Sequence, residues 1–143
     1  MSFMEKINLA ALAGGVLALG WYLVRVVPQI GQVPLDEIAW KWPMAIAMGI
    51  FIVLLVISAV RMAISDPAVR KADGIIDDER DRDIERRGDA WGGHAMHAVG
   101  FAALVMLVLD VHSFWIAQTL FVGGMLAGVV SIGVKLFAYR GEV

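Results

Sequence analysis

Two histidines, His94 and His97, stand inside an otherwise apolar stretch and are the residues there most suited to metal or haem chemistry. They lie three apart, so a helix would place both on one face. Ionisable side chains within a membrane span are functional candidates. A metal site, however, needs a third and usually a fourth ligand, and a haem held by two histidines would need one from a second copy of the chain. We therefore expect no metal and no cofactor, with both histidines neutral and hydrogen-bonded, while a histidine-based metal or haem protein stays an alternative.

The densest run of charges is residues 77–88, where ten of the twelve residues are charged. Within it Asp78 and Arg82 are four apart, as are Asp83 and Arg87, with the acid first each time. That order supports a helix by about 0.3–0.5 kcal/mol per pair. Alternating acids and bases on a helix form a pattern that can select one partner and reject others. The run is interpreted as a helical docking surface, and a solvated helix without a partner is the alternative.

The expected occupant of this surface is a soluble protein, bound through complementary charge. Ile76 and Ile84 would add an apolar anchor beside the charges. The residues expected to contact the partner are Asp77, Asp78, Glu79, Arg80, Asp81, Arg82, Asp83, Ile84, Arg86 and Arg87.

Composition places the chain in a membrane. Its 143 residues are enough for one domain, 59% of them are hydrophobic, and the mean hydropathy is +0.73. The net charge of −2 is too small to indicate direct binding of nucleic acid by a basic surface. Cysteine is absent, which excludes disulfides, thiolate metal sites and a cysteine nucleophile. No serine stands with a base and an orienting acid, and no glycine-rich phosphate loop is present. These observations predict a protein that is not an enzyme.

Four stretches reach the roughly 20 apolar residues that a spanning helix needs. They are residues 7–27, 43–64, 90–109 and 113–137, with a charged loop over 65–89. We expect one all-α domain over residues 1–143, an integral membrane four-helix bundle built from two antiparallel hairpins. A brief helix over 34–40 is expected in the other long loop. The third span either continues the charged helix without a break or kinks at Gly88, Gly92 and Gly93.

Lys and Arg predict the orientation. Ten of twelve lie near the two termini and the charged loop: Lys6, Arg61, Arg70, Lys71, Arg80, Arg82, Arg86, Arg87, Lys135 and Arg140. The other two are Arg25 and Lys41. Both termini and the charged loop should therefore face the cytoplasm, in a bacterial inner membrane. Aromatic residues are expected at the outer interface: Trp21, Tyr22, Trp40, Trp42, Phe114 and Trp115.

Small residues within the spans let helices approach closely. Gly124 and Gly128 form a small-xxx-small pair that predicts a homodimer or other homo-oligomer contact, and Gly88 with Gly92 forms another. Packing inside a single bundle is the alternative for both pairs. We expect no buried carboxylate or lysine within a span, which argues against an ion-coupled carrier. A small oligomeric channel or transporter is nevertheless kept as an alternative function.

Residues 78–89 read Asp-Glu-Arg-Asp-Arg-Asp-Ile-Glu-Arg-Arg-Gly-Asp. The chain here resembles the small predicted membrane proteins of bacteria and archaea grouped as domain of unknown function 2178. These carry a cytoplasmic Asp-Glu-Arg-x-x-x-Ile motif just before a membrane hairpin. The resemblance covers residues 74–100 and the four-span layout. It implies a membrane partner of a DNA-binding regulator of the helix-turn-helix type, and it brings no catalytic residues with it.

Overall fold

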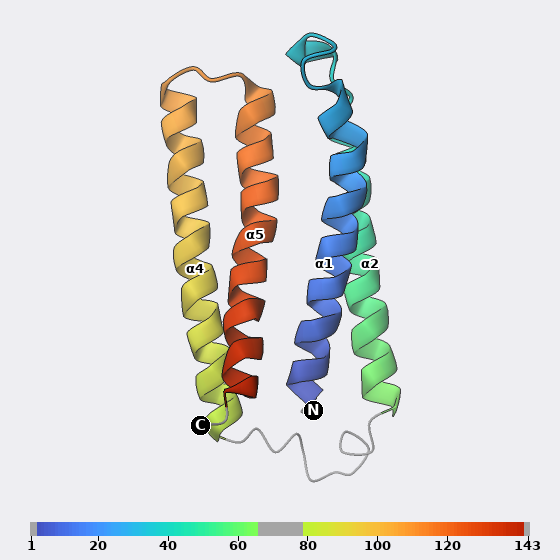
Figure 1. Cartoon of the computed structure of the whole chain (residues 1–143), viewed down its shortest axis with the longest axis vertical. Coiled ribbons are helices and arrows are strands. Elements are labelled where there is room, and N and C mark those ends of the chain that lie inside the picture. Colours follow the sequence, from blue (N-terminus) through green and yellow to red (C-terminus); the bar gives the residue numbers. More distant parts are fainter. Residues whose placement is uncertain (1–2, 66–78, 142–143) are drawn as a thin grey trace.

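The computed structural model describes residues 3–65 and 79–141. Four long helices form two antiparallel hairpins (Figure 1): α1 (Phe3–Val26), α2 (Lys41–Ser65), α4 (Glu79–Val108) and α5 (Ser113–Arg140). Within the two described ranges there is no strand. All four helices are long and apolar enough to cross a membrane. The expected all-α fold of four membrane-length helices is confirmed.

Helix α4 continues the charged run into the third span without a break. Its 30 residues correspond to about 45 Å at 1.5 Å per residue. The hydrocarbon core of a bilayer is only about 30 Å thick, so roughly a third of α4 extends beyond it. The surplus is the charged segment that begins at Glu79. Of the two possibilities that the sequence left open, the structure has the continuous helix.

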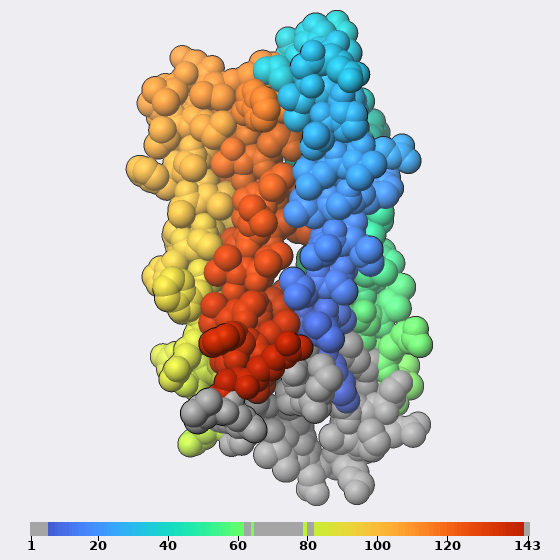
Figure 2. Space-filling view, viewed as in Figure 1, coloured from blue at the N-terminus to red at the C-terminus, as the bar shows by residue number. Residues whose placement is uncertain are grey.

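The helices pack in the order α2, α1, α5, α4. Figure 2 shows the side chains of α5 filling the space between α4 and α1. We call the end of the bundle that holds the start of α4 and the end of α5 the charged end, and the opposite end, with residues 27–40 and the turn at 109–112, the loop end. They are the lower and upper ends in Figure 1.

Glycines bring α4 and α5 together. A Cβ added at Gly92 would lie 2.6 Å from Ser131 Cβ, and one added at Gly123 would lie 2.8 Å from a Val99 methyl carbon. A Cβ added at Gly88 would likewise collide with the Lys135 side chain and with the Ser131 carbonyl oxygen. Real Cβ atoms do not approach neighbours so closely, so no larger residue fits without a shift of the helices. Gly88 and Gly92 therefore serve packing inside the bundle.

A small core closes the loop end. Tyr22 and Val26 of α1, Ala47 of α2 and Phe114 of α5 are buried there together with Ile38 of the connecting loop. The Tyr22 ring meets Phe121 edge-on, with centroids 4.8 Å apart. Tyr22 and Phe114 are fully buried, so both side chains face the interior of the bundle at its loop end.

The α1–α2 connection consists of two 3-10 turns, Val27–Gln29 and Leu35–Glu37. The brief helix expected over residues 34–40 is thus reduced to a single turn. The reason is Ile38, whose backbone is extended (φ −63°, ψ 123°) and whose side chain is buried in the core. An extended residue at this point prevents an α-helix from propagating.

The α4–α5 turn is tight, and Asp110 adopts a left-handed backbone (φ 53°) that aspartate tolerates better than most residues. His112 caps α5 by accepting a hydrogen bond from the Phe114 backbone N–H at Nδ1 (3.2 Å). Its other nitrogen, Nε2, lies 2.8 Å from Asp36 Oδ1 in the other loop. His112 therefore links the two hairpins.

Large apolar side chains point outward along all four helices. Val24, Ile52, Phe101 and Leu126, one from each helix, are all more than half exposed. Soluble proteins rarely present such a continuous apolar surface to water. Hydrocarbon is its natural surrounding, because each helix already satisfies its own backbone groups. The structure describes a multi-pass membrane protein.

Candidate docking face and its polar anchor

Four polar side chains from three helices meet at the charged end. Lys135 Nζ of α5 lies 2.5 Å from Glu85 Oε2 and 2.7 Å from Asp89 Oδ1, both on α4. Asn8 Nδ2 of α1 donates to the other Glu85 oxygen, Oε1, at 2.8 Å. Lys135 and Asn8 are only 7% and 8% exposed. We call these four residues the polar anchor, because they tie the start of α4 to the rest of the bundle.

The spacing on α4 explains how the anchor forms. Glu85 and Asp89 are four residues apart and therefore lie on one helix face. Gly88 lies on the same side, and its missing side chain leaves the room through which the Lys135 stem passes. The lysine thus reaches both carboxylates from within the α4–α5 contact.

Of the two ion pairs that Lys135 forms, the pair with Glu85 contributes more to stability. Removing a charge from water costs several kcal/mol, which close geometry and added hydrogen bonds repay. The Glu85 side chain is 20% exposed and has the further hydrogen bond from Asn8. Asp89 is 70% exposed, so solvent screens its attraction to the lysine. Glu85 therefore contributes most to holding Lys135.

The burial of Lys135 corrects the expectation that no lysine is buried in a span. A lone lysine near a helix end normally extends its charge to the interface. Here the lysine stem passes through the space above Gly88. Its charge therefore pairs with Glu85 and Asp89, two acids one helical turn apart, and stays inside the bundle. The sequence did contain the relevant pattern, which is Glu85, Gly88 and Asp89 on one face of a helix.

The opposite face of this segment of α4 is exposed and charged. We call it the docking face, and its residues are Glu79, Arg82, Asp83, Arg86 and Arg87. Asp83 Oδ2 and Arg87 Nη2 form the expected pair four residues apart, at 2.7 Å. Because the helix is fixed by its other face, these charges keep a constant arrangement relative to the membrane.

The other predicted contact residues are placed as follows. Ile84 is only 6% exposed and packs in the bundle beside Phe137 and Ala138, so it cannot act as an apolar anchor for a partner. Arg80 and Asp81 lie in the first turn of α4. Ile76, Asp77 and Asp78 lie outside the described residues. Over the described residues the docking face is therefore charged, and Ile84 does not contribute the apolar contact that the sequence suggested.

The two glycines predicted to mediate self-association have different surroundings. A Cβ at Gly124 would lie 3.8 Å from Met96 Sδ of the same chain, whereas nothing lies within 4 Å of one at Gly128. Gly124 thus already has a neighbour in its own bundle. Only Gly128 presents open space to a second copy.

His94 and His97 are exposed on the outer surface of α4. His97 Nδ1 donates to the Gly93 carbonyl oxygen one turn earlier, at 2.7 Å. In the part of the chain that the structure describes, no group of three or more His, Cys, Asp or Glu side chains could hold a metal ion. The arrangement offers at most single ligands.

Comparison of the chain with protein-family models, with curated proteins and with solved structures finds no significant match. The fold and the site themselves therefore define the class: a multi-pass helical membrane protein in which the start of α4 is ion-paired to α5 on one side and exposes charges on the other.

Proposed function

We propose that the protein is a non-enzymatic protein of the bacterial inner membrane that holds a soluble cytoplasmic protein through its docking face. The observation that supports this most is the two-sided construction of α4. One side is fixed by the ion pairs of Lys135 with Glu85 and Asp89, and the other exposes charges. A connecting loop alone needs neither a rigid extension nor a buried ion pair.

The proposed orientation places the charged end in the cytoplasm. Its basis is the excess of Lys and Arg at that end, ten against two. Single cysteines at Gln32 and Gly141 test it with a thiol reagent that does not cross membranes. In intact cells Gln32→Cys should react and Gly141→Cys should be protected; the reverse pattern would overturn the orientation.

The proposed partner is a DNA-binding regulator of the helix-turn-helix type, the class that the family resemblance implies. A face that carries charges of both signs can recognise a partner of complementary charge and reject others. The polar anchor lies at the end of the bundle and is held closed by its own ion pairs. That favours a structural role over a transport pathway.

Photo-crosslinking in living cells tests the docking face directly. A photoreactive amino acid is placed at Asp83 or Arg86, and at Gln32 of the loop end as the matched exposed control. We expect one discrete soluble protein to be captured from the first two positions and not from the third, and mass spectrometry identifies it. Capture of only lipid and membrane proteins from Asp83 and Arg86 would contradict the proposal, and a captured protein that does not bind DNA would reject the regulator.

A further inference from the structure

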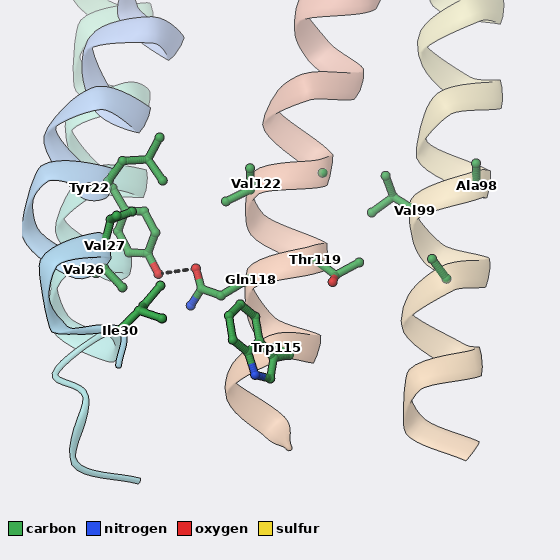
Figure 3. Close-up of a pocket in the computed structure, with 13 residues that line it drawn as sticks. Tyr22, Val26, Val27, Ile30, Ala98, Val99, Trp115, Gln118, Thr119 and Val122 are labelled. Carbon is green, nitrogen blue, oxygen red and sulfur yellow. Dashed lines mark hydrogen bonds between the residues drawn. The ribbon is translucent and has the colours of Figure 1, made fainter. Parts of the chain in front are cut away.

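An apolar cleft of about 610 Å³ lies near the loop end of the bundle (Figure 3). Helix α5 forms its floor, and α1 and α4 form its two walls. Val26 lines the α1 wall, and Val99 and Ala102 line the α4 wall. The volume lies within the range of roughly 300–1,000 Å³ that small-molecule sites occupy. Size and lining therefore suit a slender apolar ligand.

The cleft contains one buried side-chain polar atom that has no hydrogen-bond partner among the described residues. The Tyr22 hydroxyl donates to Gln118 Oε1 at 2.6 Å, which identifies the oxygen side of the amide (Figure 3). Gln118 Nε2 is buried and has no hydrogen-bond partner among the described residues. The terminal torsion of glutamine is soft, so a small rotation directs this N–H at an acceptor in the cleft. A buried unpaired donor is unfavourable, and an acceptor brought by a ligand relieves it.

The depth of Gln118 indicates where that acceptor lies. Trp115, which lines the cleft from the first turn of α5, belongs to a residue type that gathers at the level of lipid headgroups. Gln118 is about one helical turn deeper, and Val122 about 14 Å from the start of α5 at 1.5 Å per residue. One leaflet of hydrocarbon is about 15 Å thick, half of the 30 Å core. The cleft therefore spans one leaflet, with its unpaired donor just below the headgroups, where the ester groups of a glycerolipid lie.

We propose that this cleft binds one acyl chain of a membrane glycerolipid and that Gln118 Nε2 donates a hydrogen bond to the ester carbonyl of that chain. The chain lies against Val26, Val99 and Ala102. In a helix from a second copy the backbone carbonyls are already bonded within that helix, whereas the ester carbonyl of a lipid is free to accept. The site is separate from the docking face at the other end of the bundle and does not depend on the proposed function.

Ether lipids provide the sharpest test, since a dialkyl lipid has the same headgroup and chains as its diacyl counterpart but no ester carbonyl. The full chain is reconstituted in an equal mixture of the two, extracted in mild detergent, and its retained lipid counted by native mass spectrometry. We expect retention of the diacyl lipid over the dialkyl lipid by about three-fold, the ratio for one intramembrane hydrogen bond.

Three variants complete the experiment. Gln118→Leu should bring the ratio to about one, whereas Gln32→Leu, at an exposed position in the loop, should leave it unchanged. Ala102→Phe, which fills the cleft, should lower retention of both lipids. A ratio of one in the wild type, an undiminished ratio in Gln118→Leu, or displacement of the diacyl lipid by an isoprenoid quinone would each overturn the proposal.

Discussion

Lys135 Nζ and Glu85 Oε2 lie 2.5 Å apart across the contact between α5 and α4, and the second oxygen of Glu85 is bound by Asn8 of α1. One carboxylate thus joins three helices at the charged end. The charged segment of α4 is rigid because this carboxylate and its lysine are buried together.

Replacing Lys135 with Met should destabilise the protein by about 2–4 kcal/mol, because the change leaves Glu85 largely buried without its counter-ion. Unfolding in a mild detergent titrated with a denaturing one measures the loss. The double variant Lys135→Met with Glu85→Gln should recover much of it, since the uncompensated charge is gone. Equal stability of the single and double variants would show that the pair is not coupled.

Gly88 and Gly93 form a matched pair on α4. A Cβ at Gly88 collides with Lys135 and with the Ser131 carbonyl, while nothing lies within 4 Å of one at Gly93. Gly88→Ala should therefore cost about 1–3 kcal/mol through overpacking. Gly93→Ala should be neutral or stabilise the helix by up to about 1 kcal/mol. The same unfolding assay compares them, and a harmless Gly88→Ala would contradict the close contact.

His112 should contribute to the stability of the loop end through its cap on α5. His112→Ala removes the acceptor for the Phe114 N–H, at an expected cost of about 1 kcal/mol. Asn is a strong capping residue, so His112→Asn should retain most of the stability. Thermal unfolding, monitored at the aromatic residues of the small core at the loop end, measures the difference in stability between the variants. Identical losses in both variants would assign the effect to the contact with Asp36.

Self-association, if it uses α5, should depend on Gly128 and not on Gly124. Gly128→Leu places a side chain in open space and should weaken a contact with a second copy. Gly124→Leu should instead disturb Met96 and lower the stability of the single chain. Energy transfer between labelled copies in bilayers measures association. If the wild-type protein is monomeric in bilayers, the prediction is wrong and both glycines serve only packing within one bundle.

The sequence was sufficient for the spans because lipid imposes a strict condition on them. Each must be about 20 apolar residues long and satisfy its own backbone. The sequence also indicated a helix before the third span, because Asp83 and Arg87 have the helical spacing of four residues. In the structure they form an ion pair.

It was much harder to predict which side chains of each helix face the neighbouring helices. A span has little amphipathic pattern, because lipid and protein interior are equally apolar, so the sequence does not say which side of a helix meets its neighbour. Ile84 was therefore assigned to a partner although it packs inside. Lys135 was missed because its burial depends on the space above Gly88, a property of two helices together.

The central claim, that the docking face holds a soluble protein, is tested most directly by matched charge reversals. The variant Arg82→Glu with Arg86→Glu changes two exposed residues of the docking face. The control Arg61→Glu with Arg140→Glu changes two exposed residues at the same end of the bundle but outside that face. After labelling confirms that both variants keep the wild-type orientation, the partner identified by crosslinking is quantified, without crosslinking, in membrane and soluble fractions. We predict that the first variant releases most of the partner and that the control retains it. Equal release by both variants, or by neither, would contradict the account.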